Sequence, residues 1–290
     1  MKTGSFYMLL SFINVQLLAI IVGWIFIISQ VSVTENPADI GNSAFFFGYV
    51  LAAALGILVV LKYYKGKLLF YILELGMVFA SFSIFFGILP FDDIALPGGI
   101  FIPWALILGI LSVILRILFP SYKNIFLLFA TSIVGALLGA SLDIIPAALL
   151  AMALSIYDVV AVFYTKHMVT LAKELGDREA GFSITFPSDL KGKVIPKSKM
   201  MKYKKLYKRE LIGAVELGTG DLAIPAMLVV SALKFGFWYS MAAALGATFG
   251  ISLLFFYIEK KKGYWPALPP IVFFALLAMF LYYISPIKIS

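Results

Sequence analysis

Four acidic residues lie inside otherwise apolar stretches of the sequence: Glu74, Asp158, Glu216 and Asp221. A charged carboxylate at the centre of a bilayer costs about 3 kcal/mol or more, so each of these residues needs a reason to be there. The two aspartates have the more suggestive neighbours, because Tyr157 precedes Asp158 and the residues Gly218, Thr219 and Gly220 precede Asp221. These neighbours single out the aspartates as candidates for chemistry.

Two carboxyl groups that are held close together cannot both ionise comfortably, so they share a proton and titrate as a coupled pair. The ionised member can take a proton from a water molecule while the protonated member donates a hydrogen bond to a carbonyl group. Aspartic proteases hydrolyse peptide bonds in this way, without a metal ion or a cofactor. The chemistry suits a chain that has no cysteine and whose one histidine is His167.

Other hydrolytic mechanisms have little support in the sequence. One histidine cannot build a usual zinc site and there is no H-E-x-x-H helix, so we expect no metal and no cofactor. A serine mechanism would depend on His167, which follows Lys166 at the end of an apolar stretch, as an ordinary interfacial residue does. Polar contacts between packed helices are the simpler explanation for Glu74, with Lys67 as its candidate partner, and they stay open as an alternative for the aspartates.

The elements that must position these residues are membrane spans. Of the 290 residues, 62% are hydrophobic and 13% are charged, whereas about 25% are charged in an average soluble domain. Apolar runs close to the ~20 residues that cross a bilayer recur along the whole chain, which predicts one polytopic membrane domain, residues 1–290, of the all-α class. We place nine transmembrane helices at 6–29, 44–61, 68–90, 100–119, 125–142, 144–166, 211–233, 236–258 and 266–286.

The distribution of basic residues orients these spans. With the N-terminus in the cytoplasm and the C-terminus outside, 21 of the 23 Lys and Arg residues fall on the inner side, and only Lys234 and Lys288 fall outside. This asymmetry follows the positive-inside rule and indicates a multi-pass protein of the cell membrane. Because the basic residues are spread over every inner connection, the net charge of +8 does not indicate a nucleic-acid partner.

A long connection at 167–210 separates the sixth predicted span from the seventh. Its lysines suit a cytoplasmic loop that contacts anionic lipid headgroups. Within it, the segment GFSITFP at 181–187 places β-branched and aromatic residues between glycine and proline, which predicts a short strand. Loops longer than about 15 residues in a compact domain are usually functional or disordered.

Helix geometry brings the two aspartates to a similar depth. At the helical rise of 1.5 Å per residue, Asp158 lies about 12 Å from the inner end of its span and Asp221 about 16 Å from the inner end of the next. Glycines at 218 and 220 allow that helix to unwind, and the prolines in YWPALPP at 264–270 predict extended backbone before the ninth span. Such backbone at membrane depth is tolerated only beside protein or a water-filled cavity. Glu216 suits either a structural partner of Asp221 or a residue on the path to the site.

Three motifs in the expected order resemble those of presenilin-type intramembrane aspartyl proteases. They are Tyr157-Asp158 in the sixth span, Gly218-Thr219-Gly220-Asp221 in the seventh and Pro266-Ala267-Leu268 at the ninth. The nine spans and the long sixth-to-seventh loop are similar as well, and the lack of extra soluble domains is most like an archaeal presenilin homologue. Signal peptide peptidases share the motifs but are inverted in the membrane, so the charge distribution favours the presenilin orientation.

The resemblance implies a role for each motif. Asp158 and Asp221 would form the catalytic dyad, and Tyr157, Gly218, Thr219, Gly220 and Pro266-Ala267-Leu268 would contact substrate. The expected activity is hydrolysis of peptide bonds within single-pass transmembrane proteins or peptides by an activated water, without evident accessory subunits. The alternative is a proton- or cation-coupled transporter, since transporters also use broken helices and carboxylates at the bilayer midplane.

Overall fold

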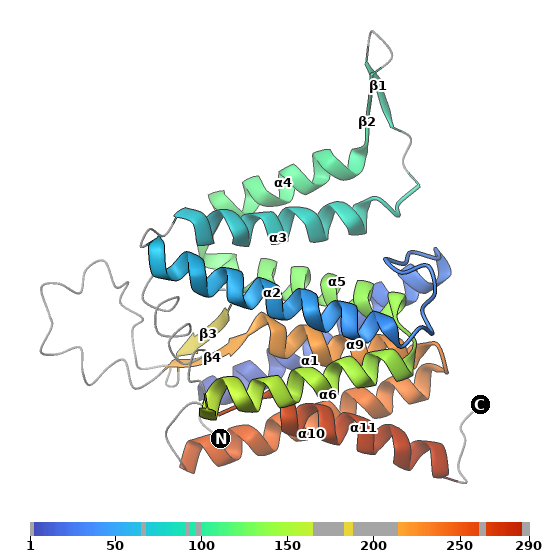
Figure 1. Ribbon diagram of the computed structural model, residues 1–290. Coiled ribbons are helices and arrows are strands. Elements are labelled where there is room, and N and C mark those ends of the chain that lie inside the picture. The colour runs from blue at the N-terminus through green and yellow to red at the C-terminus, as the bar shows by residue number, and fades with distance from the viewer. Residues whose placement is uncertain are drawn as a thin grey trace, which may run out of the picture.

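The structure is a computed structural model, and it describes residues 3–64, 68–90, 93–96, 100–164, 183–187, 214–260 and 265–285. Within these ranges the chain forms nine α-helices, two short two-stranded antiparallel sheets, a 3-10 turn and a π-helical turn (Figure 1). The predicted all-α class of membrane protein is therefore confirmed, with the strands as local additions.

The elements follow one another in a simple order. The first half of the chain contains α1 (Thr3–Ile28), α2 (Gly41–Tyr63), α3 (Leu68–Phe86), β1 (Ile94–Leu96), β2 (Ile100–Ile102), α4 (Trp104–Leu118), η1 (Pro120–Tyr122) and α5 (Lys123–Ser141). The second half contains α6 (Ile144–Val159), η2 (Val160–Tyr164), β3 (Ser183–Pro187), β4 (Ala214–Gly218), α9 (Thr219–Leu233), α10 (Phe237–Lys260) and α11 (Leu268–Ile284).

Among the described residues, five helical segments are long and apolar enough to cross a membrane: α1, α3, α5 with η1, α6 with η2, and α10. The other four helices, α2, α4, α9 and α11, are apolar over shorter lengths. Large apolar side chains are exposed along many of these helices, as expected where the surrounding solvent is lipid.

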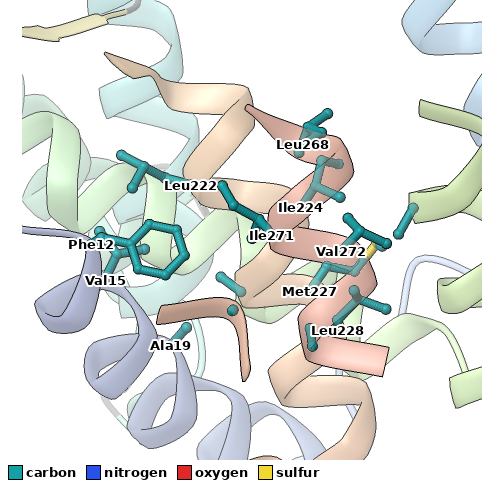
Figure 2. Close-up of a cluster of buried hydrophobic side chains, with 14 of the residues drawn as sticks. Phe12, Val15, Ala19, Leu222, Ile224, Met227, Leu228, Leu268, Ile271 and Val272 are labelled. Carbon is teal, nitrogen blue, oxygen red and sulfur yellow. The ribbon is translucent and has the colours of Figure 1, made fainter. Parts of the chain in front are cut away.

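Helix α9 forms the centre of the bundle. It contacts α1, α5, α6, α10 and α11, and every residue from Ile224 to Leu233 is buried. A helix that is apolar on all sides is expected to be surrounded by other helices in this way. Figure 2 shows side chains of α1, α9 and α11 converging in this core, with Phe12, Leu222 and Ile271 among them.

Small residues allow the neighbouring helices to approach α9 closely. A Cβ added at Gly139 of α5 would lie 2.6 Å from the carbonyl oxygen of Met227, and one added at Gly135 would lie 2.9 Å from that of Ala223. On α1, a Cβ at Gly23 would overlap the side chain of Val230. Because lipid supplies little hydrophobic drive for association, close packing of this kind is a main source of helix–helix stability in membranes.

Two predicted spans begin later than expected, and each starts with a strand. The span placed at 100–119 is helical only from Trp104, because residues 100–102 pair with 94–96 in the β1–β2 hairpin. The span placed at 211–233 is helical only from Thr219, because Ala214–Gly218 is strand β4. Apolar composition alone does not separate a short buried strand from the first turns of a helix, so both boundaries were wrong.

The strand predicted within 181–187 is confirmed as β3. It pairs antiparallel with β4 over five residue pairs, from Ser183 opposite Gly218 to Pro187 opposite Ala214. Ile184 is fully buried in the main core, which anchors this sheet to the bundle. The sheet contacts α1, and Figure 1 places it at the same end of the bundle as the start of α1, opposite the end of α11. The rest of the 167–210 loop lies outside the described residues.

Candidate active site

Asp158 lies in the last turn of α6 and is buried, with 7% of its surface exposed. The backbone N–H of Leu268 donates a hydrogen bond to its Oδ2 atom at 3.2 Å, and the backbone amide of Ala267 also interacts with this carboxyl group. The segment Pro266-Ala267-Leu268 is therefore in direct contact with the candidate aspartate. The sequence placed these residues in one region but did not predict the bond between them.

The proline-rich start of α11 explains why this contact forms. The first N–H groups of a helix have no partner within the helix, so they are available to an acceptor outside it. Pro269 and Pro270 fall in this first turn and have no N–H, which suits the helix start and leaves the amide of Leu268 as a donor at this position. The positive end of the helix dipole also favours a carboxylate here.

Asp221 also lies at the start of a helix, in this case its own helix, α9. It lies in the first turn of that helix, and Gly218 is the N-cap residue, with extended backbone at φ −66° and ψ 146°. The backbone of Gly218 hydrogen-bonds the Asp221 carboxyl group, and a Cβ added at Gly218 would lie 3.3 Å from Asp221 Oδ2. Inside the helix, Pro225 cannot donate to the carbonyl of Asp221 four residues earlier. This helix start is therefore shaped around the aspartate.

The structure brings the two aspartates together. Helices α6 and α9 are in contact, and the carboxyl groups of Asp158 and Asp221 are near enough to interact electrostatically. Asp221 keeps partial exposure, whereas Asp158 is buried. Each carboxyl group faces the N-terminus of a different helix, Asp158 that of α11 and Asp221 that of α9. Such a pair can share a proton and act as acid and base on a water molecule.

The flanking residues of the two motifs lie around this pair. Tyr157 is half-buried and interacts electrostatically with Asp158. Thr219 is the first residue of α9, and Gly220 is exposed, with no atom within 4 Å of an added Cβ. The space beside Gly220, one residue before Asp221, is thus open. Pro266 and Ala267 are buried just before α11, and Ala267, the N-cap residue, already has helical backbone angles instead of the extended backbone that the prolines predict.

The remaining two membrane-depth acids are not part of this pair. Glu74 is buried on α3 and accepts hydrogen bonds from Arg116 of α4, at 2.7 Å from its Nη2 and 3.1 Å from its Nε, while Lys123 lies 3.5 Å away. The expected helix-packing role of Glu74 is confirmed. The partner proposed from the sequence, Lys67, lies outside the described residues. Glu216 lies on β4 opposite Thr185, and not on a helix as its spacing had suggested.

Within the described ranges, no three His, Asp or Glu side chains gather in a group that could hold a metal ion. The groups that the site offers for chemistry are its two carboxyl groups and the backbone amides at two helix starts.

These features define a multi-pass helical membrane protein with a pair of interacting aspartates at one end of the bundle, of which Asp158 is buried and Asp221 is partly exposed. Residues 9–285 match the family described as signal-peptide peptidase, presenilin aspartyl protease, and the chain belongs to that family. A comparison with curated proteins gives no match.

Two solved structures described as a presenilin family intramembrane aspartate protease share the fold. The form in space group P2 has a TM-score of 0.62 and the form in space group C222 has a TM-score of 0.60, both at 24% sequence identity. The alignments cover 94% of this chain and 95% and 94% of the two structures, respectively.

Proposed function

We propose that this protein is an intramembrane aspartyl endopeptidase of the G-x-G-D type, in which Asp158 and Asp221 activate a water molecule. The observation that best supports the proposal is the arrangement of the two carboxyl groups, which interact with each other while each faces a helix N-terminus. Membership of the presenilin and signal-peptide peptidase family points the same way.

In this proposal one carboxyl group accepts a proton from water, and the other hydrogen-bonds the carbonyl oxygen of the scissile peptide bond. The attacking oxygen forms a bond to the carbonyl carbon and gives a tetrahedral species. Proton transfer to the nitrogen then breaks the C–N bond and releases two peptides. Neither step consumes a cofactor.

The substrates are single-pass transmembrane proteins or peptides, and cleavage requires that their helix unwinds locally, because an intact helix keeps its peptide groups in internal hydrogen bonds. Extended substrate then needs new backbone partners, which strands provide by β-augmentation. The β3–β4 sheet is suitably placed, since β4 ends at Gly218, three residues before Asp221. Gly220 leaves space for close approach, and Thr219, Tyr157 and Pro266-Ala267-Leu268 would complete the contacts.

The charge distribution supports the orientation that we propose. We place the protein in the cell membrane with its N-terminus and the 167–210 loop in the cytoplasm and its C-terminus outside, since basic residues concentrate on that side. The loop lysines would contact anionic lipid. The proposed activity uses only residues of this chain, without accessory subunits.

The direct test is incubation of the purified protein in detergent with a single-span peptide, followed by mass analysis of the fragments. Two new fragments that sum to the peptide plus one water, with the cut inside the apolar stretch, are expected. If the peptide stays intact while vesicles that contain the protein take up protons or cations, the protein is a transporter and the protease proposal is wrong.

A further inference from the structure

An aromatic cluster borders the candidate active site, and only its tryptophan falls in a segment singled out in the sequence, YWPALPP at 264–270. We call Phe163, Tyr257 and Trp265 the Trp265 cluster. The ring of Trp265 meets that of Tyr257 edge-on, with centroids 4.8 Å apart and an interplanar angle of 87°. It meets the ring of Phe163 in the same way, at 5.6 Å and 78°. Edge-to-face pairs at these distances are the favoured geometry for aromatic rings.

Each member of the cluster comes from a different element next to the site. Phe163 lies on the π-helical turn η2, five residues after Asp158. Tyr257 lies near the end of α10. Trp265 lies three residues before Leu268, whose amide donates to Asp158. The indole ring of Trp265 thus contacts the turn η2, which follows Asp158, and belongs to the segment whose Leu268 amide donates a hydrogen bond to Asp158.

The local backbone makes this connection important. Residues 265–267 form no helix or strand, and Pro266 has no N–H to bond a neighbour. The far side of the segment is fixed by α11, which packs on α10 so closely that a Cβ added at Gly250 would lie 2.5 Å from the carbonyl oxygen of Pro270. On the near side, the structure describes the ring contacts of Trp265 and the packing of buried Ala267 in the main core. The ring contacts therefore help to hold the end of the segment that lies farthest from α11.

The turn that carries Phe163 is itself unusual. A single π-helical turn inserts an extra residue into a helix and is common at functional sites. In η2 it extends α6 directly beyond Asp158, so the orientation of Phe163 and that of the last turn of α6 are linked. The contact between Phe163 and Trp265 therefore affects the positions of both Asp158 and Leu268, which are joined by a hydrogen bond.

We propose that Trp265 is a positioning residue for catalysis: its ring contacts with Phe163 and Tyr257 hold the Pro266–Leu268 segment at the distance from Asp158 that the reaction requires. This inference rests on the proposed protease function. The residue acts through Leu268 and Asp158 and not on the substrate. The buried indole N–H, which has no partner among the described residues, is not required for this role.

The test compares Trp265→Ala, which removes the ring contacts, with Trp265→Phe, which keeps an aromatic ring but loses the N–H. The matched control is Trp238→Ala at the opposite end of α10, where the ring contacts Phe237 and is 40% exposed. For each variant, kcat and KM for a single-span peptide are measured per folded molecule, with thermal unfolding as the measure of fold.

A misplacement of about 1 Å can lower a rate on the order of 100-fold, so we expect kcat of Trp265→Ala to fall about 10- to 100-fold with KM changed less than about threefold. Trp265→Phe should keep kcat within about threefold of wild type, as should Trp238→Ala. Wild-type kcat in Trp265→Ala would overturn the inference. So would a Trp265→Phe variant as slow as Trp265→Ala, since the N–H and not the ring would then be responsible.

A second variant covers the case in which Trp265→Ala does not fold. Phe163 is 45% exposed, so Phe163→Leu should leave the fold intact while removing one ring contact. Its kcat should fall about 3- to 10-fold, and a rate equal to wild type would contradict the inference. A wild-type protein that cleaves no peptide would instead count against the proposed function and would be recognised before any variant is compared.

Discussion

The backbone amide of Leu268 donates to Oδ2 of Asp158 at 3.2 Å, across 110 residues of sequence. The bond joins the end of α6 to the start of α11, and it forms where prolines at 269 and 270 leave few other N–H groups in the first turn of α11. A carboxylate that receives amide donors from a helix start is held in one orientation. The geometry of the candidate dyad therefore depends on a segment that contributes no acidic residue.

Replacing either aspartate by asparagine should abolish cleavage, because the mechanism needs one carboxyl group as base and the other as acid. Asp158→Asn and Asp221→Asn are expected to lower the rate below detection while the protein still folds. The control is Asp143→Asn. Asp143 lies away from the site and forms an ion pair with Lys234, with 2.9 Å between Oδ1 and Nζ. Fragment analysis by mass spectrometry checks the result, and normal cleavage by either dyad variant would refute the catalytic assignment.

Gly220→Ala should lower cleavage without destabilising the fold. The added methyl group meets no atom of the protein within 4 Å, so packing is unaffected, but it occupies space that the proposal assigns to substrate. Gly56→Ala on α2 is the matched control, because a Cβ there also meets nothing within 4 Å. We expect kcat/KM to fall about tenfold or more only in Gly220→Ala, a loss that corresponds to about 1.4 kcal/mol. Equal rates for the two variants would remove Gly220 from the proposed substrate path.

Breaking the buried ion pair between Glu74 and Arg116 should destabilise the contact of α3 with α4 and leave the chemistry intact. Both side chains are almost fully buried, and removing one partner of such a pair typically costs about 3–5 kcal/mol. Glu74→Gln should therefore lower the unfolding temperature, while activity per folded molecule stays near that of wild type. The double variant Glu74→Gln with Arg116→Met should recover part of the loss, because the buried guanidinium is no longer left without a partner, and the remaining cation, Lys123, is 23% exposed. Loss of activity in folded Glu74→Gln would connect this pair to the site.

Replacing Gln16 by leucine should stabilise the protein. Gln16 is 1% exposed on α1, and neither polar atom of its side chain has a partner among the described residues. A buried polar group without a partner costs about 1–3 kcal/mol, which the apolar residue of similar size avoids. Ser132→Ala is the contrasting case, because that buried hydroxyl donates to the carbonyl of Leu128 at 2.8 Å. The unfolding temperature should rise for Gln16→Leu and not for Ser132→Ala. A lower unfolding temperature for Gln16→Leu would indicate that the Gln16 amide has hydrogen-bond partners.

The proposed orientation can be checked with single cysteines, since the chain has none of its own. A cysteine at Ser198, in the 167–210 loop, should resist an impermeant thiol reagent added outside intact cells. A cysteine at Glu35, in the exposed connection between α1 and α2, should react. The opposite labelling pattern would show that the protein has the inverted orientation in the membrane.

The catalytic roles of Asp158 and Asp221, which their isolated charge in apolar runs indicated, stay predictions. The sequence was sufficient to predict the helical class and the approximate positions of the nine helices among the described residues, because apolar length is a local signal. It was insufficient for the boundary at Thr219. The run Ala214–Gly218 reads as part of an apolar helix, and only its pairing with Ser183–Pro187, about 30 residues earlier, makes it a strand. The position of Trp265 in contact with Phe163 was likewise invisible, because it depends on how α6, α10 and α11 pack. The proline and the aromatic residues around 264–270 were the available signal, and they indicated extended backbone but not a ring contact.

The β3–β4 pairing has a mechanical consequence for the active site. Because β4 continues directly into α9, the register that sets Ser183 opposite Gly218 also sets how far Asp221 reaches along the bundle. Strand residues advance by about 3.3 Å each, so a slip of two residues, which keeps the same side chains facing inward, would move the start of α9 by about 6.6 Å. Fully buried Ile184 resists such a slip. The register of this small sheet thus helps to fix the distance between Asp221 and Asp158.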